Sequence, residues 1–237
     1  MTKSLALILG LLPASRIKNV LLRWLCGYII EPGVRIYPCL LLNVRSLTLR
    51  EGAVVGLLTT LRDLHAAELG RGAAFGNFNW ITAADVLSDQ SPRASTIKLG
   101  DGAAITSRHY IDCSGGVEVG RFSTVAGVRS VFFSHGIDVD SCEQVASPIS
   151  IGEFCLISSA VRVVPGVSIA DRCLVAMGSV VARNLDESDC LYAGVPAAKK
   201  RKVAGHYFTR AHAFVRGRAS EEVLLVTSSD SGRAKEV

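Results

Sequence analysis

The sequence of 237 residues lacks the cysteine and nucleic-acid-binding signals of several common protein classes. Its seven cysteines include no Cys-x-x-Cys pair and no zinc-ligand spacing, which fits a reducing cytoplasm better than a secreted disulfide scaffold. No DNA- or RNA-binding motif accompanies the basic run at residues 199–202, although the net charge is +5. We therefore expect a cytoplasmic protein with no nucleic-acid partner.

A membrane-spanning segment is also missing near the N-terminus. Residues 5–12 are mostly Leu, Ala and Ile and are followed by Pro13, whereas a spanning helix needs about 20 apolar residues. A secretory signal peptide is the rival interpretation, but Lys3 is the only early basic residue and no clear Ala-x-Ala site follows.

The next segment mixes basic and large apolar residues. Residues 16–25 contain Arg16, Lys18 and Arg23 among aliphatic side chains, with Trp24 near the end. Two interpretations are open: a helix that only caps a repeat domain, as solenoids require, or a cap that also lies on an anionic bilayer. We expect a helical cap or membrane-surface segment at residues 1–33. Under the second interpretation, residues 1–30 contact the inner face of the membrane.

What the sequence does contain is a period of six. In residues 151–181 a β-branched aliphatic residue opens every hexad, at Ile151, Ile157, Val163, Ile169, Val175 and Val181. An α-helix cannot keep every sixth residue on one face, and a plain strand repeats every two residues. Three short strands joined by tight corners can place every sixth residue on the inside. The hexads therefore predict an all-β protein, a parallel β-helix in which three hexads form one coil.

The same frame recurs at residues 99–116 and 119–136, with Val117 and Glu118 as a two-residue insertion between them. Fainter copies begin at Leu47, Leu69, Phe75 and Ile81.

Two polar stretches interrupt the repeat, at residues 85–94 and 137–148. The second carries several acidic residues, and we expect a loop there that projects from the helix and has a function. A tolerated surface insertion is the alternative. We place the β-helix domain at residues 34–196 and a basic C-terminal tail at residues 197–237.

His135 is the candidate for chemistry among the five histidines. It ends a coil just before the second interruption. A neutral imidazole near pH 7 can accept a proton from a hydroxyl group and so act as a general base. The alternative is a corner histidine whose ring bonds a backbone carbonyl.

Four short motifs occur in order along the chain: Phe-Ser-His-Gly-Ile-Asp at 133–138, Pro-Ile-Ser-Ile-Gly at 148–152, Gly-Ser-Val-Val at 178–181 and Ala-Gly-Val-Pro-Ala at 193–197. This ordered set resembles the hexapeptide-repeat acyltransferases, in particular the O-acetyltransferases of the maltose, galactoside and exopolysaccharide branches. The resemblance covers about residues 99–203. It implies a left-handed parallel β-helix, a homotrimer, and acetyl-CoA bound along the cleft between two neighbouring subunits.

The implied activity is a CoA-dependent O-acetyltransferase that moves an acetyl group from acetyl-CoA to a sugar hydroxyl, in surface polysaccharide or glycan biosynthesis, with no metal. The residue matching the family's base, His135, would deprotonate the acceptor hydroxyl, and backbone amides would stabilise the oxyanion. Asp112 and Asp138 are the candidates for fixing its tautomer. With His109, they are the expected acceptor-binding residues, and a structural role is the alternative for His109.

The resemblance also implies the residues that line the acyl-CoA cleft. A small residue at Ser159 would let the pantetheine arm approach, and Gly178 and Ser179 would lie along the same cleft. Three basic residues would meet the phosphates of CoA, for which forked arginine donors are well suited: Arg183, Lys199 and Arg201.

Two other functions remain open, and a third is disfavoured by the sequence. A sugar N-acyltransferase would use the same base and donor. A non-catalytic β-helix assembly module would need neither His135 nor CoA. A carbonic-anhydrase-like hydratase would need three imidazoles around a metal, and the spacing His-x₄-His is absent.

Overall fold

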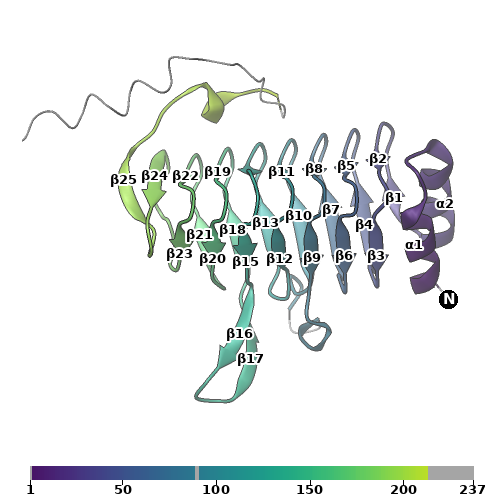
Figure 1. The fold of residues 1–237 in the computed structure, drawn as a ribbon, viewed down its shortest axis with the longest axis horizontal. Coiled ribbons are helices and arrows are strands. Elements are labelled where there is room, and N and C mark those ends of the chain that lie inside the picture. Colours follow the sequence, from purple (N-terminus) through teal and green to yellow (C-terminus); the bar gives the residue numbers. More distant parts are fainter. Residues whose placement is uncertain (1, 89–90, 213–237) are drawn as a thin grey trace, which may run out of the picture.

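The computed structural model describes residues 2–88 and 91–212. Part of the predicted C-terminal tail, residues 213–237, therefore lies outside the described residues. Within the described segments, short parallel strands wind through three faces of a triangular prism, and each coil stacks on the one before (Figure 1).

Each face is a parallel sheet whose strands come from successive coils. Face 1 consists of β1 (Ile29–Ile30), β4 (Ser46–Leu49), β7 (Ala66–Leu69), β10 (Thr96–Leu99), β13 (Val117–Val119), β18 (Ile149–Ile151) and β21 (Ser168–Ile169). Face 2 consists of β2 (Arg35–Ile36), β5 (Val54–Val55), β8 (Ala74–Phe75), β11 (Ala104–Ile105), β14 (Thr124–Val125), β19 (Leu156–Ile157), β22 (Leu174–Val175), β24 (Cys190–Ala193) and the antiparallel β25 (Ala198–Lys202). Face 3 consists of β3 (Leu40–Leu42), β6 (Thr60–Arg62), β9 (Trp80–Thr82), β12 (Tyr110–Asp112), β15 (Val131–Phe132), β20 (Arg162–Val163) and β23 (Val180–Val181).

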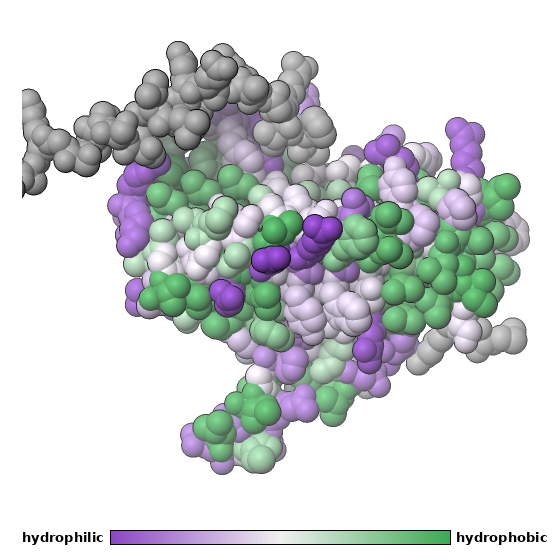
Figure 2. All heavy atoms as spheres, viewed as in Figure 1, coloured by the Kyte–Doolittle hydropathy of each residue, from purple (hydrophilic) through white to green (hydrophobic). Residues whose placement is uncertain are grey.

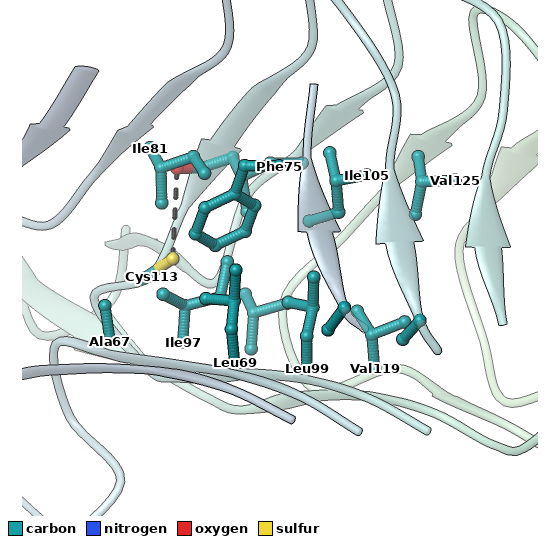
Figure 3. Packing of buried hydrophobic residues seen from close by; sticks show 14 of the residues in the cluster. Ala67, Leu69, Phe75, Ile81, Ile97, Leu99, Ile105, Cys113, Val119 and Val125 are labelled. Carbon is teal, nitrogen blue, oxygen red and sulfur yellow. Dashed lines mark hydrogen bonds between the residues drawn. The ribbon is translucent and has the colours of Figure 1, made fainter. Parts of the chain in front are cut away.

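The residues that open the hexads form the core, as predicted. Leu99, Val119 and Ile151 are in register on face 1, and Figure 3 shows Leu69, Leu99 and Val119 opposite Phe75, Ile105 and Val125 of face 2. All of these side chains are buried. Each fully buried aliphatic side chain contributes about 1.5–3 kcal/mol of hydrophobic stabilisation, so the repeat itself supplies most of the core.

One hexad is shifted from its predicted frame. Val131 was expected to point inward, but the structure places Phe132 in register with Ile111 and Val163, and Val131 is half-buried. The corner after Val125 is one residue longer than the matching corner after Ile105, and this extra residue moves the frame.

The early coils are complete, although their hexad signal is faint. The first strand begins at Ile29, inside the segment expected to be the cap. Between Leu61 and Leu69 the chain is two residues longer than a hexad, because β7 adds a second buried position at Ala67. Val117 fills the same position in β13 and pairs with Ile97, so the predicted two-residue insertion is part of a strand.

Helices α1 (Thr2–Leu11) and α2 (Arg16–Cys26) cover the open end of the first coil (Figure 1). The Ser15 side chain caps α2 by accepting a hydrogen bond from the backbone of Lys18, and Gly27 ends the helix in the left-handed conformation. Leu9 and Leu22 join the core. In the described part of the chain, neither these helices nor any other could cross a bilayer.

Lys18 does not reach the outer surface of the cap. Its buried ammonium group donates to the carbonyl oxygens of Gly10 (2.7 Å), Leu12 (2.8 Å) and Tyr37 (3.1 Å). Burial lowers the pKa of this amine. Lys18 therefore ties α1, α2 and the first coil together, and it is unavailable for the bilayer contact expected from the sequence.

The two predicted loops project from the same side of the prism (Figure 1). The first contains the short 3₁₀ helix η1 (Asp85–Leu87). The second is an antiparallel hairpin of β16 (His135–Asp138) and β17 (Glu143–Ala146), in which His135 pairs with Ala146. The hairpin thus begins at His135 itself, two residues before the predicted loop.

The basic run lies in a strand rather than in a tail. Residues 199–202 form most of β25, which pairs with β24. The chain then turns back through η2 (His206–Thr209), where the Tyr207 hydroxyl donates to the carbonyl oxygen of Cys155 at 3.1 Å. The guanidinium group of Arg210 lies 3.9 Å from the Tyr207 ring centroid and also donates to the carbonyl oxygen of Phe122.

Candidate active site

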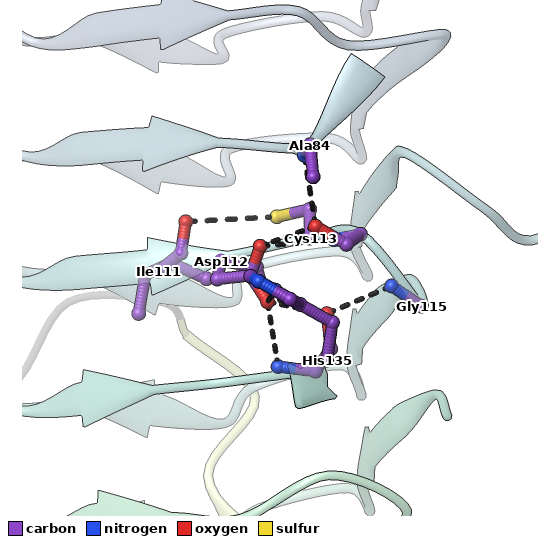
Figure 4. A network of polar contacts seen from close by, with 8 residues as sticks. Ala84, Ile111, Asp112, Cys113, Gly115 and His135 are labelled. Carbon is purple, nitrogen blue, oxygen red and sulfur yellow. Dashed lines mark hydrogen bonds and ion pairs between the residues drawn. The ribbon is translucent and has the colours of Figure 1, made fainter. Parts of the chain in front are cut away.

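The candidate site lies at the edge where face 3 turns into face 1, which we call edge 3/1. Asp112 is the last residue of β12, and His135 begins the hairpin one coil later. Oδ2 of Asp112 lies 2.8 Å from Nδ1 of His135 (Figure 4). An ionised carboxylate can only accept, so Nδ1 carries the proton and Nε2 is left with a free lone pair. This is the tautomer that a general base requires.

The carboxylate of Asp112 is held in place from both sides. Its Oδ1 accepts from the Ser114 hydroxyl at 2.5 Å, and its Oδ2 accepts from the Ser134 backbone N–H at 2.8 Å. Only 2% of Asp112 is exposed. Burial by itself raises the pKa of Asp112, but the hydrogen bonds from Ser114, His135 and Ser134 outweigh it and bring the pKa below its ordinary value.

Ser114 extends this network to a third coil. Its hydroxyl oxygen accepts from the backbone N–H of Ala84 at 2.8 Å while its proton is donated to Asp112 (Figure 4). The result is one continuous chain of hydrogen bonds from the first projecting loop, through Asp112, to His135. Such a chain fixes the carboxylate more firmly than a single contact would.

Ser134 and Gly115 close the corner beneath the pair. The Ser134 hydroxyl lies 2.8 Å from the carbonyl oxygen of Asp112, to which it donates, and accepts from the Gly115 backbone at 2.9 Å. A Cβ atom added at Gly115 would lie 2.6 Å from the backbone of Ser147. Glycine is therefore required where these three segments meet.

His135 is partly open to solvent. Its side chain is 29% exposed, and Nε2 forms no hydrogen bond with any residue in the described segments. The ring of Phe133 lies edge-on to the imidazole, with centroids 6.4 Å apart. Nε2 is thus available to a substrate.

A row of aromatic side chains leads along face 3 to His135. Tyr110 is in register with Trp80 on the neighbouring coil, and its ring centroid lies 5.6 Å from that of Phe133. All three are exposed, by 37–44%. We did not expect this row from the sequence, because the three residues fall on different coils whose register was unknown.

His109 does not line this site. It is buried at the opposite edge of face 3, edge 2/3, where the Ser130 backbone donates to Nδ1 at 3.1 Å and Nε2 lies 3.0 Å from the Thr106 hydroxyl. Burial lowers the pKa of His109 to about 4. Both ring nitrogens are used within the chain, so His109 is a structural histidine and the expected acceptor contact is not supported.

Asp138 is not the partner of His135 either. It lies at the exposed end of β16, where one oxygen accepts from the backbone of Asp140 at 2.9 Å and of Ser141 at 3.0 Å. These hydrogen bonds lower the pKa of Asp138 and shape the hairpin turn. Of the two candidate carboxylates, Asp112 alone contacts the imidazole.

Two of the predicted cofactor positions stack at edge 2/3. The Gly178 backbone donates to the carbonyl oxygen of Ser159 at 3.0 Å, and the Ser159 hydroxyl lies 3.3 Å from the backbone nitrogen of Val128. Gly178 is exposed, and a Cβ added there would meet no atom within 4 Å. Ser179, in contrast, is 1% exposed and its hydroxyl accepts from the Gly194 backbone at 3.2 Å, so its side chain faces the corner and not an outer groove.

The three basic positions lie apart from that edge. Arg183 is exposed at edge 3/1, and Lys199 and Arg201 are on β25. Lys199 forms an ion pair with Glu187 at 2.6 Å. Within one chain, therefore, the six predicted cofactor residues are divided between two edges and the added strand. No group of three His, Cys, Asp or Glu side chains in the described segments could hold a metal ion.

No protein-family model and no curated protein sequence matches the chain. Solved structures do match. A point mutant of AntD, an N-acyltransferase from Bacillus cereus, in complex with dTDP and coenzyme A, is 13% identical, with a TM-score of 0.55 over 81% of this chain and 90% of that one. A second point mutant of AntD, in complex with dTDP-4-amino-4,6-dideoxyglucose and coenzyme A, is 14% identical, with a TM-score of 0.52 over 81% and 92%.

A maltose O-acetyltransferase from Clostridium difficile 630 also matches, at 16% identity over 86% of this chain and 87% of that one, with a TM-score of only 0.41. At these identities, the likeness to AntD concerns the fold. The chain has the parallel β-helix predicted from its hexapeptide repeats, left-handed as the family resemblance implied, and this is the fold of the acyltransferase AntD.

Proposed function

We propose that this protein is a CoA-dependent O-acetyltransferase that transfers the acetyl group of acetyl-CoA to a sugar hydroxyl, with His135 as general base. The observation that carries the proposal is the contact of 2.8 Å between Asp112 and His135, with Nε2 open to solvent. The fold is shared with AntD, whose structures contain coenzyme A and, in one case, a dTDP-sugar.

The proton moves through Nε2. As the acceptor oxygen attacks the thioester carbonyl, Nε2 takes its proton, and the imidazolium that forms lies against the Asp112 carboxylate. When the tetrahedral intermediate breaks its carbon–sulfur bond, Nε2 returns that proton to the departing thiolate. The products are an acetyl ester and CoA thiol, so no covalent intermediate on the protein is needed. General base catalysis of this kind contributes roughly 10²–10⁴-fold.

Asp112 serves as the positioning residue. Its charge favours the imidazolium, and its hydrogen bond keeps the imidazole from rotating or changing tautomer. Although the carboxylate is buried, it stays ionised because it accepts hydrogen bonds from Ser114 and Ser134. The acceptor sugar would approach along Trp80, Tyr110 and Phe133, since aromatic faces pack well against the apolar face of a pyranose ring.

The acyl donor would lie between subunits of a homotrimer. The predicted cofactor residues are divided between two edges of the prism, which supports a cleft made from one edge of each of two neighbours. Ser159 and Gly178 would flank the pantetheine arm, and Arg183, Lys199 and Arg201 would meet the phosphates. An acceptor in glycan biosynthesis also agrees with a place at the inner face of the membrane, in contact through residues 1–30.

A sugar N-acyltransferase is the second candidate, because AntD is an N-acyltransferase and the same base could take a proton from a neutral amino group as it attacks the thioester. The two are distinguished by offering acetyl-CoA together with amino sugars or with the matching hydroxy sugars. Mass spectrometry then identifies an amide or an ester.

The test of the proposed function is the His135→Ala variant, with Asp138→Asn as the matched control on the same hairpin. We expect thiol release from acetyl-CoA to fall by at least about 100-fold in His135→Ala and to stay unchanged in the control. Light scattering should show the same oligomer for both. Full activity of His135→Ala would exclude this mechanism, and failure of acetyl-CoA to raise the melting temperature would favour a non-catalytic assembly module.

A further inference from the structure

The outer surface of the N-terminal cap is apolar. Helix α2 presents Ile17, Val20 and Trp24 outward, 73%, 41% and 83% exposed, at the spacing of one helix face. Ile8 and Leu11 of α1, which packs against α2, are also exposed. Figure 2 shows apolar side chains gathered at the end of the molecule where the two helices lie. Single exposed apolar residues are ordinary, but a gathered set of this kind marks a binding surface.

The charged side chains of residues 1–30 are all basic. Residues 1–30 contain four basic residues and no Asp or Glu. Glu31 is the first acidic residue, and its carboxylate is taken by Arg50 at 2.7 Å. Lys18 is turned inward, which leaves Arg16 and Arg23 exposed on α2. Neither they nor Arg35 forms an ion pair with any of the described residues.

A groove runs between α2 and the first coil. Its volume is about 590 Å³. Its lining includes three arginines, Arg16, Arg23 and Arg35, and the apolar side chains of Val20, Ile30 and Val34. Glu31 also lines it, but its carboxylate is paired with Arg50. Guanidinium groups bind phosphate oxygens with forked hydrogen bonds, and the apolar lining residues suit the glycerol and the first methylenes of a lipid.

We propose that the cap docks on an anionic lipid bilayer, with Trp24 and Ile17 in the interface and a lipid phosphate held in the groove by Arg16, Arg23 and Arg35. This inference deepens the membrane contact within the proposed function by naming its ligand and its binding residues. It would stand even if acyl transfer were disproved, because it depends on the cap alone.

A second copy of the chain is a poorer occupant. Two caps placed face to face would bring the same arginines together with no acidic residue in residues 1–30 to neutralise them. A bilayer supplies the missing negative charge and the apolar phase at once. The β-helix would then stand away from the membrane, with His135 four coil spacings, or about 19 Å, beyond the first coil.

The test is sedimentation of the full chain with vesicles of phosphatidylcholine, with and without phosphatidylglycerol. We expect binding only to the anionic vesicles. Arg16→Gln, Arg23→Gln and Arg35→Gln together should weaken it by roughly 100-fold, because each basic residue near an anionic surface contributes about fivefold. Replacing Arg108, Arg129 and Arg162 by Gln removes the same charge three or more coils beyond the first coil and should leave binding within about twofold. Equal losses in both triple variants would mean that vesicle binding depends only on the net charge of the protein and not on the groove, which would overturn the proposal.

A second measurement separates docking from folding and from self-association. In a Trp80→Phe variant, Trp24 is the remaining tryptophan. Its emission should shift to the blue with anionic vesicles but not with soluble glycerol phosphate. No shift, or an equal shift with neutral vesicles, overturns the proposal. The double variant Ile17→Ser/Trp24→Ser gives a third outcome that would overturn the proposal. If this variant changes oligomeric state but binds vesicles as before, the apolar surface contacts a second copy of the chain and not a bilayer. Acetyl transfer to a soluble acceptor, measured in parallel, reports on the proposed function separately.

Discussion

Ser147, the first residue after the hairpin strands, donates its backbone N–H to the carbonyl oxygen of Ser134, the last residue before them, at 2.8 Å. The hairpin is thus closed at its base, and the coil on either side continues as if it were absent. Gly166 of the next coil donates in turn to the carbonyl oxygen of Ser147 at 3.3 Å. The hairpin is therefore separable from the β-helix that carries it.

Shortening the hairpin should leave the fold intact but impair catalysis. Gly136 and Val145 are paired in register, so residues 137–144 can be replaced by Asn-Gly, which favours the tight turn of a two-residue hairpin. We expect the melting temperature to change by less than about 4 °C and kcat/KM to fall roughly tenfold, because the hairpin shields one side of His135 from water. An unchanged kcat/KM would identify the hairpin as a tolerated insertion.

Asp112→Asn should lower kcat with little effect on the KM for acetyl-CoA. The amide preserves the shape but removes the charge that stabilises the imidazolium, and it can present an N–H to Nδ1 and so favour the wrong tautomer. We expect kcat to fall by about 100-fold or more, with Asp138→Asn as the control. A rise in KM at constant kcat would instead point to a role in binding.

His109 should make the fold sensitive to mild acid. Its pKa in the folded state is about 4 because burial disfavours the charged ring, whereas an unfolded histidine titrates near 6.5. The unfolded chain therefore binds the extra proton first. The contribution of neutral His109 to the free energy of unfolding is therefore complete above about pH 6.5. As the pH falls toward 4, the free energy of unfolding decreases by up to about 3 kcal/mol.

The measurement is the free energy of unfolding in urea between pH 7 and pH 4, for the wild type and for His109→Gln. We expect the variant to be less stable at pH 7 but to lose less stability on acidification. Parallel curves would mean that other groups cause the acid sensitivity. Asp112 contributes in a lower range, since its depressed pKa keeps its stabilisation until the pH falls below its ordinary value.

Gly178 and Ser179 are neighbours that should respond differently. Gly178 has a φ of +74° and open space around it, and Asn tolerates that conformation, so Gly178→Asn should fold. If acyl-CoA lies along this edge, its KM should rise roughly tenfold because the new side chain narrows the cleft. Ser179→Ala should instead cost about 1 kcal/mol of stability, from the lost hydrogen bond to Gly194, with KM unchanged. The opposite assignment of the two effects would contradict the proposed path of the cofactor.

Much of the fold could be predicted because the core repeats in the sequence. The frame of Leu99, Ile105 and Ile151 is correct, since an aliphatic residue at every sixth position suits stacked coils of three strands and suits neither an α-helix nor a plain strand. The errors arise where a corner or a strand changes length. One extra residue before Phe132 shifted a hexad, and the two extra residues before Leu69 made the early coils faint. Corner length leaves no hydrophobic signature, so it is visible only in the register.

The candidate site was predictable in part. His135 stood out because it ends a regular coil before an interruption, and Asp112 was one of two possible partners. The choice between Asp112 and Asp138 depends on stacking, since residues far apart in the chain become neighbours one coil apart. The same argument explains His109, which lies at edge 2/3 whereas His135 lies at edge 3/1. Ser114 was missed because no sequence pattern distinguishes a buried serine in a network from any other small corner residue.

The stacking of Asp112 on His135 has a consequence for how this protein could vary in length. The pair is built across a single step between adjacent coils, and the coils between the cap and β9 contribute no atom to it. Whole coils could therefore be gained or lost on that side without altering the contact of 2.8 Å. If the cap does dock on a bilayer, each added coil would raise the reaction centre by about 4.8 Å. The number of early coils would then set the distance from the bilayer surface at which His135 reaches an acceptor.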